Sequence, residues 1–341
     1  MLRARTKKMK ENKNKKKENG QYFTIKNPFK LKIFKRWFKY VYHNEVILEP
    51  FAGANNIVAL VNEVCPKTKF KSFDIDTSFK NVYPKVKVVK RDTLTNFPKG
   101  YNTVITNPPY LAKNSATRNK LYYPNTNYDD IYKYSLEIML NNVDNVAAII
   151  PESFVTSGLF IDRLYAVSSL TTKMFNDTEC PVCLALFVKE KENLEIEENN
   201  FLLYRMDEYI GEYNSILKKI NKYLSNENII EWKFNDVNGN IGIKCVDNTK
   251  EPTIYFLEGE EVEKSRIKVS SRALTRVSGL PKNIKTKNFI NKCNNLINEY
   301  RNKTKDIFLT SFKGLRADNC YRRRLDFKTA RQIMNKALEA M

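Results

Sequence analysis

The 341-residue sequence is poor in histidine and cysteine, with one histidine and six cysteines in the whole chain. So few of these residues do not support a disulfide-linked scaffold or a metal site built on histidine. Cys180 and Cys183 have the CxxC spacing, but they have no second pair and no histidine nearby, so we interpret them as packed thiols. We therefore predict a protein without a bound metal.

Long apolar segments are also missing. No run approaches the roughly 18 apolar residues that a membrane-spanning helix needs, and the lysine-rich start is not followed by the apolar stretch of a secretory signal. The phosphate-binding patterns GxxxxGK(S/T) and GxGxxG are absent too, which disfavours nucleoside triphosphates and dinucleotides as ligands. These absences predict a soluble, cytoplasmic protein that has no membrane partner.

Positive charge is abundant and unevenly placed. The chain has 59 Lys and Arg against 38 Asp and Glu, a net charge of +21. Residues 1–20 hold nine basic and two acidic residues, residues 264–341 hold twenty and five, and residues 21–263 are nearly balanced with 30 and 31. Such a surplus predicts a polyanionic partner, nucleic acid in particular, that meets the two ends of the chain. We interpret residues 1–20 as a basic disordered arm.

Short apolar runs alternate with helix-length segments along residues 21–190. The runs are 46–48, 70–73, 86–89, 103–106, 146–150 and 183–188, and the expected helices are 29–42, 56–64 and 128–141. This alternation predicts an α/β domain with a doubly wound, mostly parallel sheet, whose ligands bind beyond the carboxyl ends of the strands. In residues 191–341 we expect a second, smaller mixed α+β domain, with a hairpin joining 229–234 to 241–246.

The tetrapeptide Asn107-Pro108-Pro109-Tyr110 directly follows the predicted strand 103–106. Two consecutive prolines fix φ and remove two backbone donors, so the loop presents carbonyl oxygens beside the Asn107 side-chain oxygen. Such a pair of acceptors suits an exocyclic amine, and Tyr110 offers an aromatic face to a planar ring. The tetrapeptide is therefore our candidate for the catalytic residues.

Three other predicted strands end in acidic or turn residues. The segment 49–55 (EPFAGAN) follows the first strand and contains a glycine turn that suits the approach of a nucleoside-like ligand. Asp74 follows the second strand, where an acid can accept hydrogen bonds from ribose hydroxyls. Asp92 follows the third strand, where it can accept from an adenine amino group.

Together these elements resemble the N6-adenine DNA methyltransferases that use S-adenosylmethionine. Residues 21–24 (QYFT) look like their amino-terminal cofactor motif, residues 49–55 like motif I, and residues 107–110 like the catalytic (D/N/S)PP(Y/F) motif. Residues 146–157 resemble the strand and loop that these enzymes carry after the catalytic strand. The resemblance implies a Rossmann-like methyltransferase domain over residues 21–190. It also implies that S-adenosylmethionine is held by Thr24, Glu49, Pro50, Phe51, Ala52, Gly53, Asp74, Ile75, Asp92 and Thr93.

The resemblance also implies a mechanism and a partner. An adenine of duplex DNA would rotate out of the helix, its N6 would donate to Asn107 and Pro108, and Tyr110 and Phe175 would stack on its faces. Because only 53 residues separate Gly53 from Asn107, target recognition falls to residues 191–341, as in the gamma arrangement. Our candidates for DNA contacts, mostly to phosphate, are Arg272, Arg276, Lys313, Arg316, Arg322, Arg323 and Arg324. We expect a monomer that modifies DNA, with a possible cognate restriction endonuclease encoded separately.

Two alternatives stay open. An RNA methyltransferase, acting for example on ribosomal RNA, would also use a basic surface and an NPPY-type motif. A non-catalytic DNA-binding protein with a decayed site is the other, because Asn55 stands where the family commonly has a second glycine. Asparagine tolerates a left-handed backbone better than any residue except glycine, so we expect the turn to persist.

Overall fold

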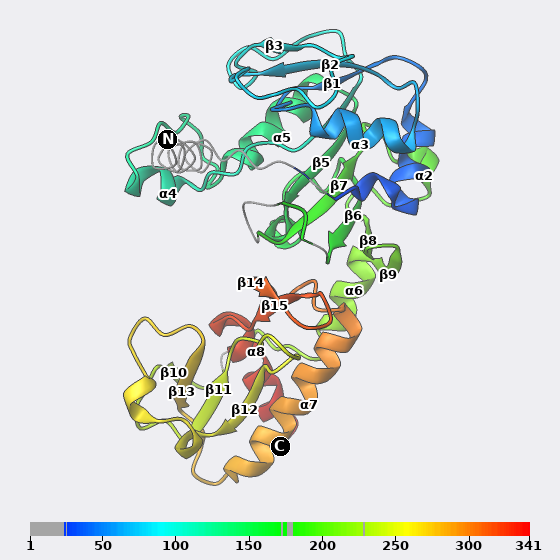
Figure 1. The fold of residues 1–341 in the computed structure, drawn as a ribbon. Helices are drawn as coiled ribbons and strands as arrows, with labels where there is room; N and C mark the ends of the chain where they lie inside the picture. Colours follow the sequence, from blue (N-terminus) through cyan, green and yellow to red (C-terminus); the bar gives the residue numbers. More distant parts are fainter. Residues whose placement is uncertain (1–23, 25, 172, 176–179, 228) are drawn as a thin grey trace. The chain divides into compact units, whose positions relative to one another are not determined.

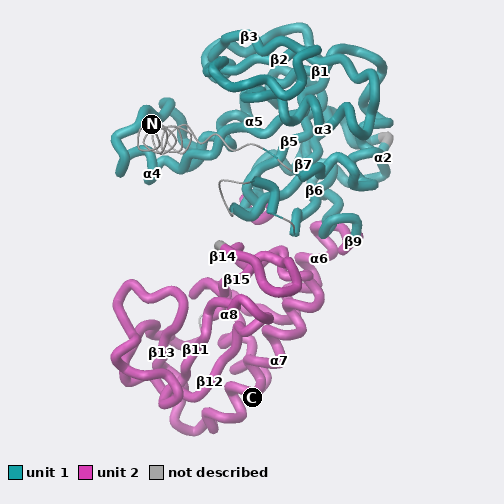
Figure 2. Tube along the Cα trace, viewed as in Figure 1, with its two compact units in different colours: residues 1–154, 158–208 teal, residues 155–157, 209–341 magenta. Residues whose placement is uncertain are grey.

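The computed structural model describes residues 24, 26–171, 173–175, 180–227 and 229–341. The chain divides into two compact units, which Figure 2 distinguishes by colour. Unit 1 comprises residues 1–154 and 158–208, and unit 2 comprises residues 155–157 and 209–341. The basic arm 1–20 and the motif residues Gln21, Tyr22 and Phe23 lie outside the described residues.

Unit 1 is built on the predicted doubly wound sheet (Figure 1). The strands of this sheet that lie in unit 1 have the order β3-β2-β1-β4-β5-β7-β6-β8, and the remaining strand, β9 (Glu208–Glu212), belongs to unit 2 from residue 209 on. The first five strands of that order run parallel, and β7 is inserted antiparallel between β5 and β6. The strands of unit 1 are β1 (Val46–Glu49), β2 (Lys69–Asp74), β3 (Val88–Lys90), β4 (Thr103–Thr106), β5 (Asn145–Pro151), β6 (Leu164–Leu170), β7 (Val182–Phe187) and β8 (Leu202–Arg205). The predicted fold class is confirmed.

Helices follow the strands as the alternation requires. The α-helices of unit 1 are α2 (Lys32–Val41), α3 (Asn56–Val64), α4 (Lys113–Arg118) and α5 (Ile131–Asn142), with 3₁₀ turns η1 (Pro28–Lys30) and η3 (Glu192–Leu194). A further 3₁₀ turn, η2 (Glu152–Thr156), spans the boundary between the units at residue 154. Helix α2 buries five side chains at helical spacing, Ile33, Phe34, Trp37, Phe38 and Val41. The Trp37 indole N–H also donates to the Phe187 carbonyl of β7, at 3.0 Å, so this helix is fixed to the sheet. The near-continuous apolar strands β5 and β7 form the centre of the core.

Unit 2 is a mixed α+β body, as predicted. Its four-stranded antiparallel sheet has the order β10-β13-β11-β12, and a separate two-stranded hairpin joins β14 to β15. The strands are β10 (Lys233–Phe234), β11 (Ile241–Lys244), β12 (Tyr255–Glu258), β13 (Leu274–Ser278), β14 (Thr310–Leu315) and β15 (Tyr321–Arg324). The helices are α6 (Tyr213–Ile220), α7 (Thr286–Thr304) and α8 (Phe327–Glu339), with 3₁₀ turns η4 (Gly259–Glu261) and η5 (Lys264–Arg266).

One predicted pairing is wrong. The segments on either side of residues 238–240 do not form a hairpin, because β13 lies between β10 and β11 in the sheet. The turn at residues 238–240 therefore joins two strands that each pair with a third, and that third strand comes more than thirty residues later in the chain. Strand β6 was not expected either, although all seven of its residues are buried.

Candidate active site

Four parallel strands of unit 1 end at one cavity of about 470 Å³. It lies beyond the carboxyl ends of β1, β2, β3 and β4, where a doubly wound sheet binds its ligands. Its size falls in the range of small-molecule sites, roughly 300–1,000 Å³. The predicted site residues that line it are Thr24, Phe51, Ala52, Gly53, Asp74, Ile75, Asp92, Thr93, Asn107 and Pro109. The sequence motifs that seemed separate along the chain thus share one cavity.

The turn after β1 has the left-handed backbone that its sequence requires. Gly53 has a φ of 48° and Asn55 a φ of 63°. The Gly53 amide donates to Asp74 Oδ2 at 2.7 Å, which joins the ends of β1 and β2. The Asn55 side chain is buried and donates to the Val86 carbonyl at 2.7 Å, so it also fastens the loop before β3. The left-handed turn thus persists with asparagine in place of the second glycine.

Glu49 lies behind the wall of the cavity and is completely buried. Its Oε1 accepts hydrogen bonds from the Thr106 hydroxyl at 2.5 Å and the Phe51 amide at 3.0 Å, while Oε2 has no partner. Burial raises the pKa of the Glu49 carboxyl to about 8, against these two hydrogen bonds, which lower it. Glu49 therefore joins the end of β4 to the β1 turn, and its contact with a cofactor stays a prediction. Pro50, likewise not on the cavity wall, accepts from the Thr93 hydroxyl at 2.8 Å.

The two predicted ligand acids occupy the cavity in different ways. Asp74 is almost completely buried, and its oxygens accept from the amides of Gly53 and Asp76, at 2.7 and 2.8 Å. Burial raises the pKa of the Asp74 carboxyl, and the backbone hydrogen bonds lower it in part. Since a carboxylate has about four acceptor positions and three backbone amides, those of Gly53, Ile75 and Asp76, bind to this one, capacity for a ligand remains. Asp92 is half-buried and accepts from the Leu94 amide at 3.0 Å.

Two polar atoms on the cavity wall are buried without a hydrogen-bond partner. They are Oγ1 of Thr24, whose side chain was predicted to contact the cofactor, and Oδ1 of Asn56, which sequence reasoning missed. Leaving a buried polar group unpaired costs about 1–3 kcal/mol, so both atoms suit a polar ligand. A hydroxyl donor beside an amide oxygen acceptor fits a group that carries both an anion and an ammonium.

The catalytic candidates lie at the end of β4. The Tyr110 hydroxyl lies 2.5 Å from both Asn107 Oδ1 and the Ile149 carbonyl oxygen, so its single proton serves two acceptors. Burial raises the pKa of the Tyr110 hydroxyl well above its usual value, which keeps it a donor at neutral pH. Asn107 and Pro109 line the cavity, whereas Pro108 is buried beneath them.

The predicted aromatic pair does not form a sandwich. The rings of Tyr110 and Phe175 meet edge to face, with centroids 6.1 Å apart and an interplanar angle of 72°. A base held between two faces needs roughly 7 Å between parallel rings, twice the contact distance of carbon atoms. Phe175 is completely buried and also bridges to Thr24. In this arrangement the two rings contact each other, and the expected stacking of both on one base is not formed.

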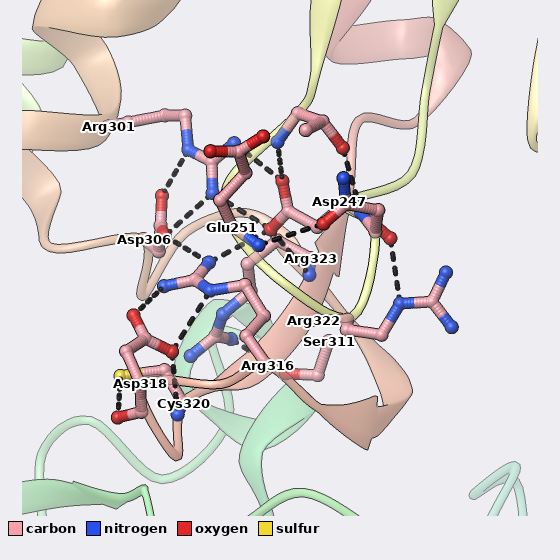
Figure 3. Close-up of polar contacts among 12 residues, drawn as sticks. Asp247, Glu251, Arg301, Asp306, Ser311, Arg316, Asp318, Cys320, Arg322 and Arg323 are labelled. Atoms are coloured by element: carbon pink, nitrogen blue, oxygen red, sulfur yellow. Dashed lines mark hydrogen bonds and ion pairs between the residues drawn. The ribbon is translucent and has the colours of Figure 1, made fainter.

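The predicted DNA contacts in unit 2 divide into buried and accessible residues. Arg276, Arg316 and Arg323 are at most 6% exposed and bind acceptors of the protein itself. Figure 3 shows Arg316 in a cluster around Asp247, a completely buried carboxylate that also pairs with Arg301 at 2.8 Å. A guanidinium already paired in the interior does not reach a phosphate. The structure thereby corrects the expectation for these three arginines, which stabilise unit 2.

The remaining four candidates are Arg272, Arg322, Arg324 and Lys313, and nothing is described of the Lys313 side chain. Arg272 is exposed and lies over the Phe327 ring, at 5.2 Å from its centroid. Arg322 is half-buried and donates to the Asp247 carbonyl at 2.7 Å, so it supports the hairpin β14–β15. Arg324 Nε is buried without a partner.

The cysteines, possible metal ligands and helix lengths of the described residues bear on two further predictions. All six cysteines are free thiols, and within the described residues no group of His, Cys, Asp and Glu is arranged to hold a metal ion. In that same part of the chain, no helix is both long and apolar enough to cross a membrane.

The strand order and the cavity define unit 1 as a doubly wound α/β ligand-binding fold. No protein-family model matches the chain, and no curated protein matches it. A protein from Listeria monocytogenes, assigned to the class I S-adenosylmethionine-dependent methyltransferases, matches 54% of this chain and 68% of its own, with 14% identity and a TM-score of 0.39. The methyltransferase subunit of a type I restriction-modification system from Streptococcus thermophilus matches 59% of this chain with 15% identity and a TM-score of 0.39.

The match spans about half, 53%, of the Streptococcus protein. At such low identities and TM-scores, the likeness carries no argument about activity. The residues that line the cavity are therefore the evidence for a function.

Proposed function

We propose that this protein is an S-adenosylmethionine-dependent methyltransferase that modifies the N6 amino group of adenine in duplex DNA. The observation that supports this most strongly is the shared cavity. Residues from the ends of four parallel strands line it, and they include the glycine turn, Asp74, Asp92 and Asn107. These are the positions that the sequence resemblance assigns to cofactor and target base.

The cofactor would be held by three groups of residues. In the turn after β1, Gly53 has no side chain and exposes its backbone to the cavity. Asp74 has remaining acceptor capacity for ribose hydroxyls, and Asp92 lies at the end of the next strand. The unpartnered Thr24 hydroxyl and Asn56 amide oxygen suit the carboxylate and the ammonium of the methionine moiety. When bound, S-adenosylmethionine supplies an electrophilic methyl group.

The tetrapeptide would orient the amine to be methylated. The Tyr110 hydroxyl donates to Asn107 Oδ1 and so fixes the orientation of this side chain. In the proposed complex, an N–H of adenine N6 donates to the same amide oxygen, which can accept more than one hydrogen bond. An amine held by Asn107 and the Pro108 carbonyl keeps its own lone pair directed away from both. Positioning and electrostatic complementarity of this kind contribute to the rate without a covalent enzyme intermediate. Tyr110 stays protonated and fixes the Asn107 side chain.

Calorimetry and radiolabelled transfer test the proposal together. The protein should release heat on titration with S-adenosylmethionine or with its demethylated product, and it should transfer labelled methyl to duplex DNA. Transfer to ribosomal RNA but not to DNA would favour the RNA methyltransferase. Absence of heat with either form of the cofactor would favour a non-catalytic DNA-binding protein.

A further inference from the structure

A short folded segment of unit 1 projects from the sheet shortly after the tetrapeptide 107–110. Residues 113–128, which we call the 113–128 arm, contain α4 and the loop that follows it, and Figure 1 shows α4 set apart from the sheet. The two ends of the arm are joined, because the Lys113 amide donates to the Asp129 carbonyl at 2.7 Å and the Ile131 amide donates to the Leu111 carbonyl at 3.1 Å. The arm is therefore a closed loop within the connection between β4 and α5, and its two ends lie side by side.

Hydrogen bonds and apolar contacts fix the base of the arm next to the tetrapeptide. The Asp130 carboxylate accepts from the Leu111 amide at 3.0 Å, one residue after Tyr110, and it also caps the first turn of α5. Leu111 and Ile131 form a small apolar cluster with Ala116 of α4. A ligand that binds the arm would consequently lie at a fixed place relative to Asn107.

The outer surface of the arm is cationic. It contains Lys113, Arg118 and Lys120 and no acidic residue. All three are exposed. Among the described residues, no carboxylate forms an ion pair with any of them, while Lys113 lies over the Tyr123 ring. Unpaired exposed cations of this density attract a polyanion.

An aromatic ring stands at the junction of the arm and the cavity. Tyr122 is 83% exposed, the second-largest exposure among the large apolar and aromatic side chains of the described chain. The same residue lines the cavity that contains Asn107 and Pro109. An exposed ring beside cations is the combination with which proteins bind nucleic-acid strands, through base stacking and phosphate contacts.

We propose that the 113–128 arm binds the DNA strand that flanks the target adenine, with Tyr122 stacked on a neighbouring base and Arg118 and Lys120 at its phosphates. This inference rests on the proposed function, because it assumes a nucleic-acid substrate at the tetrapeptide. It adds a DNA-binding element in unit 1 to the basic residues that the sequence placed in unit 2. Because the arm is fixed next to the tetrapeptide, DNA bound to it would present the target adenine at a defined position relative to Asn107.

Charge-neutralising variants test the phosphate contacts. We expect Arg118→Gln/Lys120→Gln to weaken binding of a fluorescein-labelled DNA duplex of mixed sequence and to lower the slope of log affinity against log salt by about 2, since each phosphate contact contributes roughly 0.9. The matched control is Lys67→Gln/Lys99→Gln, which removes the same charge from two exposed residues that precede β2 and β4, at the opposite edge of the sheet. Equal affinities and slopes for both double variants would overturn the arm's role.

Substitutions of Tyr122 test the stacking contact. With sheared, methylation-free genomic DNA as substrate, Tyr122→Ala should raise KM for DNA about tenfold, as loss of one base stack predicts, while Tyr122→Phe stays near wild type. If Tyr122→Ala instead weakens binding of S-adenosylmethionine in calorimetry and leaves KM for DNA unchanged, the ring covers the cofactor and the proposal is wrong. If the wild-type protein binds no DNA at all, the proposed function fails as well; if it methylates DNA and the arm variants behave like wild type, only the arm proposal fails.

Discussion

The buried carboxyl of Glu49 makes the stability of unit 1 depend on pH, and it lowers that stability as the pH rises. Burial raises the pKa of this carboxyl from 4.5 to about 8. Between those values the folded protein keeps a proton that the unfolded chain has released. The free energy of unfolding therefore falls as pH rises through this window, by about 1.4 kcal/mol per pH unit from this group alone.

Glu49→Gln removes this titration and keeps an oxygen that can accept from Thr106 and Phe51. Any cost of burying the new amide group is the same at every pH. Relative to wild type, the variant should therefore gain about 4 kcal/mol of stability between pH 5 and pH 8. The difference in free energy of unfolding changes in favour of the variant, because this carboxyl destabilises wild type as the pH rises and the variant does not contain it.

Urea unfolding at a series of pH values measures this difference. Trp37 lies buried in unit 1 and Trp232 in unit 2, so a Trp232→Phe background makes fluorescence report on unit 1 alone. Glu63→Gln, on the exposed side of α3, is the control for the change in charge. Parallel stability curves for wild type and Glu49→Gln across this pH range would refute the argument that Glu49 is protonated in the fold.

Three further predictions concern the site and the core of unit 2. Asn107→Ala should abolish methyl transfer, and Tyr110→Phe should reduce it, because the phenylalanine no longer donates the hydrogen bond that orients Asn107. Calorimetry should show cofactor affinity largely unchanged in both variants. Substantial activity in Asn107→Ala would contradict the catalytic assignment. Asn55→Gly keeps the left-handed turn and loses its side-chain hydrogen bonds, so urea unfolding should show a loss of about 1 kcal/mol, and Asn55→Ala should lose about 1 kcal/mol more through backbone strain; equal losses would contradict the strain. Asp247→Asn removes the buried carboxylate that Arg301 and Arg316 share, and leaves these arginines with Asp306 and Asp318 as their acidic partners. The variant should destabilise unit 2 by about 3 kcal/mol in urea, followed by Trp232 fluorescence. A loss below about 1 kcal/mol, as for a surface pair, would show that the cluster does not stabilise unit 2.

The sequence contained enough local signal to predict the sheet of unit 1. Its strands are short apolar runs separated by helix-length segments, and each predicted run coincides with a strand. In a parallel sheet the carboxyl ends of neighbouring strands lie together, so motifs at those ends had to share one edge. For that reason most of the predicted cofactor residues line one cavity, although they come from distant parts of the chain.

Features that depend on tertiary partners could not be predicted. Arg316 was predicted to contact phosphate, yet it pairs with Asp247, 69 residues away, and no spacing rule links the two. The prediction of a hairpin around residues 238–240 was wrong for a similar reason. Strand β13 comes from a distant segment and pairs with both β10 and β11. Asn56 was missed because its role depends on its Oδ1 being buried at the cavity wall without a hydrogen-bond donor, which only the packed structure reveals.

Methylation of genomic DNA, followed by mapping of the modified bases, tests the central proposal most directly. Wild-type protein with S-adenosylmethionine should place methyl groups on N6 of adenine within a defined sequence, and Asn107→Ala should place none. Absence of N6-methyladenine with a wild-type protein that binds the cofactor would contradict the account, as would modification of RNA alone.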